Sequence, residues 1–300
     1  MGMEWFKFLE NFMFSFFLSN FVNKNHIYLQ LFLCLIYLLY MVNKGGFMID
    51  THCHLSVNDY DDIDSLISKL KDNGVSKIIV NGCDMDSNKE VLSLIKKYDI
   101  VYGAIGFHPT ELDNYNDDCL SFLEEHINDR KIVAIGEIGL DYHYDGYDKS
   151  KQIDVFKKQL DIASKYNKPI IIHSRDAIGD TYNILHEYQL KGSIHAFSGS
   201  LEMAKAFIKL GYYLGIGGVV TFKNAKNIVS VLKDISLEYI LLETDSPYLT
   251  PEPYRGLKND SSYLKYIVSK IAEIKGISES EVVEITTNNA NALFDFLDNL

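Results

Sequence analysis

The 300-residue chain has little cysteine, proline or tryptophan: four Cys, five Pro and one Trp. No two cysteines form a C-x-x-C pair, and four thiols in so long a chain do not make a disulfide framework, so we expect reduced thiols and a cytoplasmic protein. A G-x-G-x-x-G segment is missing after the first expected strand, which argues against an open dinucleotide-binding sheet. No repeat, linker or low-complexity tract divides residues 48–300, which we interpret as one domain.

Positive charge is also scarce. The chain has 29 Lys and Arg against 41 Asp and Glu, a net charge of −12. A protein that binds nucleic acid independently of sequence usually has a basic face, so this balance argues weakly against DNA. Bound divalent cations are often the largest local charges in a site, however, and an acidic protein with a metal-lined mouth is compatible with an anionic substrate.

Residues 1–47 differ from the rest and form a hydrophobic N-terminal extension, dense in Phe, Leu and Tyr. Its longest apolar run, Ile27–Val42, has 16 residues, short of the roughly 20 that a membrane-spanning helix needs. Lys24 and Lys44 flank it on both sides, and no Ala-x-Ala-like cleavage site follows. The extension is a short anchor, a buried addition, or sequence upstream of a true start at Met48. We favour the last interpretation, with membrane association not expected.

From Met48 onward, short β-branched runs alternate with amphipathic segments, a pattern that predicts βαβ units and a parallel sheet. The expected strands are Met48–Leu55, Lys77–Gly82, Val101–Phe107, Ile132–Leu140, Pro169–His173, Gly192–Phe197, Tyr212–Gly217 and Ile240–Thr244. Expected helices include Asp62–Asn73, Ser150–Tyr166, Leu201–Leu210 and a closing helix, Ser278–Leu300. Eight units over residues 48–300, close to the ~250 residues of one barrel, predict an α/β fold of the (β/α)8 TIM-barrel type.

Ionisable residues at the C-terminal ends of these strands are the informative ones, because buried charge is costly unless it is paired or binds metal. They are His52, His54, Glu137, His173, His195 and Asp245. Active sites of barrels form at that end. Alternate residues of a strand point the same way, so His52 and His54 should face the barrel axis and Cys53 should face away. Four imidazoles and two carboxylates suit Zn, Mn or Mg.

Other polar residues allow two interpretations. Asp50 and Glu243 stand two residues before His52 and Asp245, respectively. Either could orient a ligand imidazole or form a structural ion pair in the barrel base. Four other histidines are interpreted as ordinary core or surface residues: His26, His126, His143 and His186.

Six motifs occur in this order: MIDTHCHL, GFHP, AIGEIGLDY, PIIIHSRDA, HAFSG and LLETDSPYLTP. With them, residues 48–300 resemble the TatD-like family of metal-dependent deoxyribonucleases of the amidohydrolase superfamily. The resemblance implies a TIM barrel, two divalent metal ions and DNase activity, often exonucleolytic. It also implies that the metal ligands are the six strand-end residues, with Glu137 bridging the two ions: His52, His54, Glu137, His173, His195 and Asp245. Two positions depart from the family pattern: Ser56 replaces an Asp or Asn, and Arg255–Ser261 replaces an Arg-Gly-x-x-Asn-Glu-Pro stretch.

The expected mechanism uses two ions, Mg, Mn or Zn, that share a water and clamp the scissile phosphate. Glu137 and Asp245 are the expected catalytic residues, with Asp245 accepting the proton of the water. Expected substrate contacts are His108, Arg175 and Arg255, with Lys258 and the aromatic Phe107, Tyr142 and Phe197 as further candidates. Each has a structural alternative: loop packing for His108, an ion pair with Asp176 for Arg175, solvation for the other cations, and core packing for the aromatics.

The predicted substrate is DNA, as single strands or ends, with no stable protein partner implied. Three alternatives stay open. The same kind of site could hydrolyse ester or amide bonds, as an aminoacyl-tRNA deacylase does. The barrel could be a non-enzymatic binding module, against which the complete ligand set argues. A membrane-anchored version would use residues 1–47.

Overall fold

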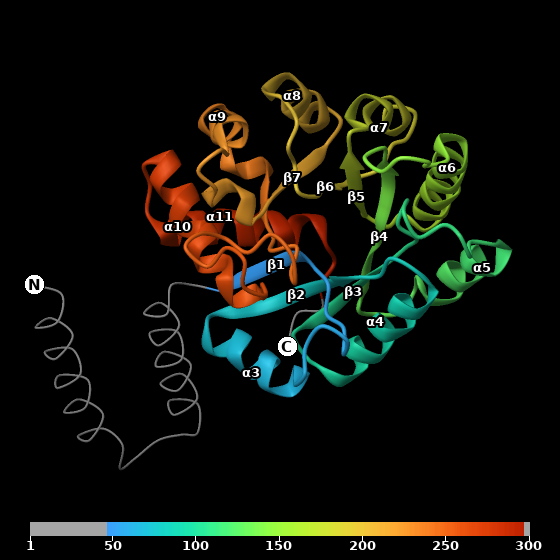
Figure 1. Cartoon of the computed structure of the whole chain (residues 1–300), viewed down its shortest axis with the longest axis horizontal. Helices are drawn as coiled ribbons and strands as arrows, with labels where there is room; N and C mark the ends of the chain where they lie inside the picture. Colours follow the sequence, from blue (N-terminus) through green and yellow to red (C-terminus); the bar gives the residue numbers. More distant parts are fainter. Residues whose placement is uncertain (1–46, 297–300) are drawn as a thin grey trace, which may run out of the picture. The chain divides into compact units, whose positions relative to one another are not determined.

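A computed structural model describes residues 47–296 of the chain (Figure 1). The expected anchor or mistaken start within residues 1–46 lies outside the described residues, so it stays a prediction. Among the described helices, none combines the length and the apolar character needed to cross a membrane.

Eight parallel strands form one sheet in chain order, from β1 to β8 (Figure 1). They are β1 Met48–Cys53, β2 Val75–Asn81, β3 Val101–Ile105, β4 Ile132–Asp141, β5 Ile170–Arg175, β6 Gly192–Ile194, β7 Tyr212–Ile216 and β8 Ile240–Leu242. The chain segment after β8 returns to β1: the Asp245 N–H donates to the His52 carbonyl at 2.9 Å, and the His54 N–H donates to the Ser246 carbonyl at 2.7 Å. The predicted TIM barrel is thereby confirmed.

Helices cover the outside of the strands (Figure 1). They are α3 Ile63–Asp72, α4 Met85–Lys97, α5 Asp117–His126, α6 Lys149–Tyr166, α7 Ile178–Leu185, α8 Leu201–Lys209, α9 Lys226–Asp234, α10 Leu264–Lys275 and α11 Glu279–Leu293. Short 3-10 turns are η1 Gly218–Thr221, η2 Leu237–Tyr239 and η3 Ser261–Tyr263. In α3 the Asp62 side chain accepts from the Ser65 N–H at 2.9 Å, and Ile63, Leu66 and Leu70 turn one apolar face inward.

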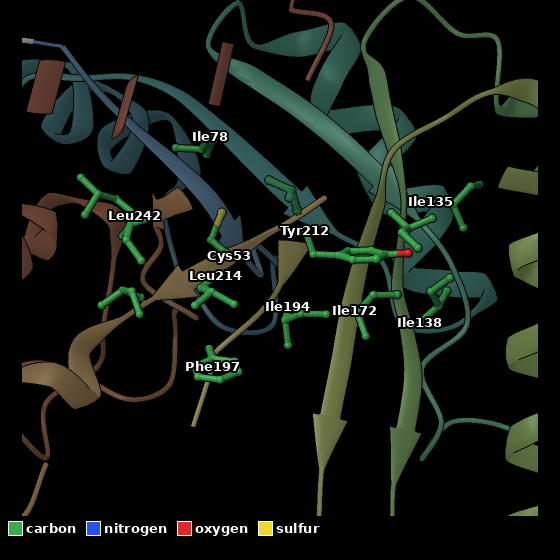
Figure 2. Packing of buried hydrophobic residues seen from close by; sticks show 14 of the residues in the cluster. Cys53, Ile78, Ile135, Ile138, Ile172, Ile194, Phe197, Tyr212, Leu214 and Leu242 are labelled. Carbon is green, nitrogen blue, oxygen red and sulfur yellow. The ribbon is translucent and has the colours of Figure 1, made fainter. Parts of the chain in front are cut away.

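Apolar side chains fill two regions. Outward-pointing strand residues pack under the helices, as Figure 2 shows for Ile172, Ile194 and Leu214 of β5, β6 and β7. Inward-pointing residues such as Ile171 and Leu241 form a second cluster inside the barrel. Each fully buried Ile or Leu contributes about 1.5–3 kcal/mol. This apolar base supports polar residues that follow on the same face of the strands, toward their C-terminal ends.

The predicted closing helix was too long. α11 ends at Leu293, and Phe294 has an extended backbone with φ −105° and ψ 133°. Phe294 and Phe296 are both buried, and the Phe296 ring lies 4.8 Å from that of Tyr102 in β3. Burying two aromatic side chains against the barrel interior outweighs another helical turn.

Six strands are also shorter than predicted at their C-terminal ends, namely β1, β2, β3, β6, β7 and β8, whereas β4 and β5 run on to Asp141 and Arg175. β6 ends at Ile194 and β8 at Leu242. Just beyond them, Ala196 has φ 43° and Asp245 has φ 56°, backbone conformations that are uncommon for residues other than glycine. The strand geometry therefore stops where the chain turns toward the mouth of the barrel.

Candidate metal centre

The six residues predicted as ligands converge at the C-terminal end of the barrel. They come from β1 (His52), the residue after it (His54), β4 (Glu137), β5 (His173), and the segments after β6 (His195) and β8 (Asp245). His52, Glu137 and His195 are buried, and the other three are partly exposed to the cavity above.

The Glu137 carboxylate lies at the centre of this group. Its Oε2 atom is 3.3 Å from His52 Nε2 and 3.5 Å from His54 Nε2. Its Oε1 atom is 2.8 Å from His173 Nδ1 and 3.4 Å from His195 Nε2. Each oxygen therefore faces a different pair of imidazoles, as a carboxylate that bridges two cations would.

Asp245 completes the group on one side. Its Oδ1 atom lies 3.7 Å from His52 Nε2 and 3.6 Å from His54 Nε2, and the two Nε2 atoms are 3.3 Å apart. Ligands at about 2.0–2.2 Å from one tetrahedral ion are themselves about 3.4 Å apart. Hence the spacing of these donor atoms fits a shared cation, and their chemistry suits Zn, Mn or Mg.

Carboxylates outside the group hold two of the imidazoles. His195 Nδ1 is 3.4 Å from Glu243 Oε1, and His173 Nε2 is 2.9 Å from Asp141 Oδ2. In each ring the opposite nitrogen faces Glu137. Such outer partners set the tautomer and orientation of metal-binding histidines, which agrees with the orienting interpretation of Glu243.

Asp50 behaves differently from both interpretations given above. Its Oδ1 atom accepts from the His52 N–H at 3.3 Å and from the Thr244 N–H at 3.0 Å, and its Oδ2 atom accepts from the Thr244 hydroxyl at 2.5 Å, so these hydrogen bonds involve no imidazole. The register of β1 shifts between Asp50 and Cys53, so a spacing of two residues does not put Asp50 on the face of His52. Asp50 instead ties β1 to the segment after β8, and burial raises its pKa to about 7.

The imidazoles and carboxylates of the site shift one another's pKa values. Burial by itself would raise the pKa of Glu137, but His52, His195 and nearby imidazoles hold it well below its usual value. The pKa of Asp245 is likewise lowered by His195 and His54 against the effect of burial. Burial by itself would lower the pKa of His195, but the nearby carboxylates of Glu137, Asp245 and Glu243 together outweigh burial and raise it to about 9. A bound cation would take the place of the imidazolium protons.

His108 lies closer to the group than predicted. Its Nε2 atom is 3.6 Å from Glu137 Oε1. Burial lowers its pKa to about 3, so the ring is neutral. Because its Nδ1 accepts from the Thr110 N–H at 3.2 Å, Nε2 carries the proton and can donate into the site.

The two predicted arginines lie in different surroundings. Arg175 lines a cavity of about 900 Å³ above the group. Its guanidinium lies 5.1 Å from the Tyr144 ring centre and donates to the Tyr144 hydroxyl at 3.2 Å. The alternative partner, Asp176, pairs with His143 at 2.8 Å instead. Arg255 is outside the cavity lining, with its guanidinium 4.3 Å from the Phe222 ring centre.

The other substrate candidates are largely engaged in packing. Lys258 donates to the Asp59 carbonyl. Phe107 is buried with its ring 5.6 Å from that of Tyr115. The Tyr142 ring stacks on Tyr147 at 4.8 Å. Phe197 is buried but does line the cavity.

Sequence reasoning missed Asp141 and Cys83. Asp141 lies four residues after Glu137 in β4, so strand alternation alone could have placed both on the inner face. Cys83 follows β2, and its Sγ atom is 3.8 Å from His54 Nδ1. A single cysteine after a strand carried no comparable signal.

Comparisons with known proteins agree on one family. The family model for TatD-related DNases matches residues 49–295. An uncharacterized metal-dependent hydrolase of Bacillus subtilis, YabD, is 43% identical over 251 residues, covering 82% of this chain and 98% of the relative. Escherichia coli YcfH, also an uncharacterized metal-dependent hydrolase, is 33% identical, covering 83% and 96%. The crystal structure of the TatD homologue YjjV from Escherichia coli superposes with a TM-score of 0.78 at 31% identity, covering 83% and 98%.

Proposed function

This chain belongs to the TatD-related DNase family of metal-dependent hydrolases, and from that premise we propose that it hydrolyses phosphodiester bonds of DNA with two divalent ions. The observation that carries the proposal is the Glu137 carboxylate, whose two oxygens face separate pairs of imidazoles. Such a carboxylate can serve two cations at once, and paired cations suit in-line displacement at phosphate.

The ligands would divide around Glu137. One ion would be held by Glu137 Oε2 with His52, His54 and Asp245, and the other by Glu137 Oε1 with His173 and His195. When bound, the ions, which we expect to be Mg, Mn or Zn, supply charge for the phosphate oxygens and lower the pKa of an attacking water toward ~7.

Side chains of the site would orient the substrate and handle the proton. Asp245 is ionised because its pKa is lowered, so it can accept the proton of the attacking water. The neutral His108 ring presents Nε2–H toward the site, where it can donate to a phosphate oxygen. Arg175 at the cavity wall can hold a second phosphate. Because Arg255 packs on Phe222 outside the cavity lining, we no longer assign it a direct contact.

A nuclease assay on the full chain tests this proposal. The protein is stripped with EDTA, reconstituted separately with Mg, Mn or Zn, and incubated with single- and double-stranded DNA labelled at the 3′ or the 5′ end. We expect metal-dependent nucleotide release, which Glu137→Ala and Asp245→Asn each abolish while far-UV circular dichroism stays native. Release of amino acid from charged tRNA, with no cleavage of DNA, would favour the ester-hydrolase alternative. Retained turnover in both variants would exclude the two-ion mechanism.

A further inference from the structure

The walls of the cavity above the metal centre are acidic. Apart from the histidines and carboxylates of the centre and their partners, its charged lining residues are Asp59, Asp84, Glu90, Glu111 and Arg175. Among residues 47–296, Arg175 is therefore the single Lys or Arg in the lining of this cavity. A groove that follows a DNA backbone over several nucleotides needs the opposite balance, with a positive charge near each phosphate.

Two of these wall carboxylates are held by hydrogen bonds to nearby backbone. Glu90 Oε1 accepts from the Val57 N–H at 2.8 Å. Asp84 caps α4 and accepts from the Ser87 N–H at 2.8 Å. Since both groups serve local backbone structure, moving either one away from a phosphate would break a hydrogen bond. A strand laid along this wall would bring like charges together.

One patch of the wall is suited to a nucleotide. Arg175 ends β5 and lies over the ring of Tyr144, which is 58% exposed. An exposed aromatic ring stacks on a base irrespective of its identity, and a guanidinium binds phosphate through two N–H groups. The cavity, about 900 Å³, is within the range of ~300–1,000 Å³ that is usual for small-molecule sites.

We propose, resting on the phosphodiesterase function above, that the substrates are short oligonucleotides recognised over a single terminal unit. The scissile phosphate lies at the metal centre, and the neighbouring base and phosphate lie on Tyr144 and Arg175. Nucleotides beyond that unit leave the cavity without a cationic contact. A DNA dinucleotide that carries a terminal phosphate therefore offers all the recognition that a long strand offers, because its internucleotide phosphate is the scissile one and its terminal phosphate can lie on Arg175.

The test compares a DNA dinucleotide that carries a terminal phosphate with a single strand of roughly 20 nucleotides, longer than the ~4–16 nucleotides of an extended single-strand groove. We expect kcat/KM values of the metal-loaded enzyme to agree within about threefold between the two substrates. Between about 50 and 200 mM salt, one phosphate contact costs about threefold in affinity for single strands, whereas six to ten contacts to duplex DNA cost about 10³–10⁵. Over this range of salt, the affinity for the dinucleotide and the affinity for the long strand should each fall by only about threefold.

Variants assign the effect to the proposed patch. Arg175→Ala should weaken both substrates equally and lower the salt slope by about one unit or less, and Tyr144→Ala should raise KM for both. Arg130→Ala is the matched control, because exposed Arg130 precedes β4 at the opposite end of the barrel and should change neither. A preference above tenfold for the long strand, or a steep salt slope, would overturn the inference while leaving the nuclease function intact. Failure to cleave DNA of either length would instead remove the proposed function.

Discussion

The strand β7 offers a way to disturb the metal centre without changing any ionisable group. Glu243 is fully buried; its Oε1 atom accepts from the Ala196 N–H at 2.6 Å and lies 3.4 Å from His195 Nδ1. Gly215 lies directly against this carboxylate. A Cβ atom at Gly215 would come within 2.1 Å of Glu243 Oε2 and 2.6 Å of Cδ. Gly215→Ala must therefore displace the carboxylate and release the His195 ring.

The expected loss can be bounded. Removing an outer partner of a ligand histidine typically costs about 10–100-fold in metal affinity, which is about 1.4–2.7 kcal/mol. Overpacking costs stability as well, about 1–3 kcal/mol, so folding is measured separately by urea unfolding. Gly217→Ala is the matched control, two residues further along the chain and also beside Glu243. Its Cβ atom would meet nothing closer than the Glu243 carbonyl oxygen at 3.6 Å, which is an ordinary contact.

The assay is a Mn²⁺ titration of metal-free protein, with free Mn²⁺ followed by electron paramagnetic resonance. Gly215→Ala and the charge-neutral Glu243→Gln should both bind Mn²⁺ about 10–100-fold more weakly than the parent, and Gly217→Ala should bind it equally well. Folded Gly215→Ala and Glu243→Gln proteins that both keep the parent affinity would refute the role of Glu243 in holding His195.

Three further outcomes are expected. Asp141→Asn should also weaken Mn²⁺ binding about tenfold or more, because Asp141 holds the Nε2 side of His173 at 2.9 Å; an unchanged titration would contradict this. Because the pKa of His195 is raised to about 9, the metal-free ring carries a proton at neutral pH, so metal binding should release protons and strengthen as pH rises toward that value. Calorimetry in buffers of different ionisation enthalpy measures this release, and its absence would speak against it. Phe207→Ala should cost about 3–5 kcal/mol of unfolding free energy, measured with urea, because the ring of this α8 residue is fully buried.

Alternation along strands predicted much of the site, because side-chain direction in a strand is a local property. His173 and Glu243 both sit where a period of two puts them, on the inner face of their strands. The same rule, applied to β4, also puts Asp141 on the inner face, because Asp141 lies four residues after Glu137. It failed for Asp50, because a register shift in β1 turns that side chain toward the β1–β8 junction, and no residue type in the MIDTHCHL segment signals such a shift.

Loops were less predictable, because tertiary contacts decide where their long side chains go. Arg175 is the last residue of β5 and Arg255 lies in the segment after β8, yet Arg255 packs on Phe222 and Arg175 packs on Tyr144 in the cavity wall. The ends of β6 and β8 likewise lie next to left-handed residues, Ala196 and Asp245; Ala does not favour that conformation, and Asp adopts it more often than Ala but does not require it. The end of α11 depends on a contact between Phe296 and Tyr102, far apart in the sequence.

If Glu137 joins two cations at the mouth of the barrel, a crystal structure of the Mn²⁺-loaded protein, with manganese located by anomalous scattering, should show two manganese peaks, one beside each oxygen of Glu137. A lone peak, or peaks away from Glu137, would show that Glu137 does not bridge two ions.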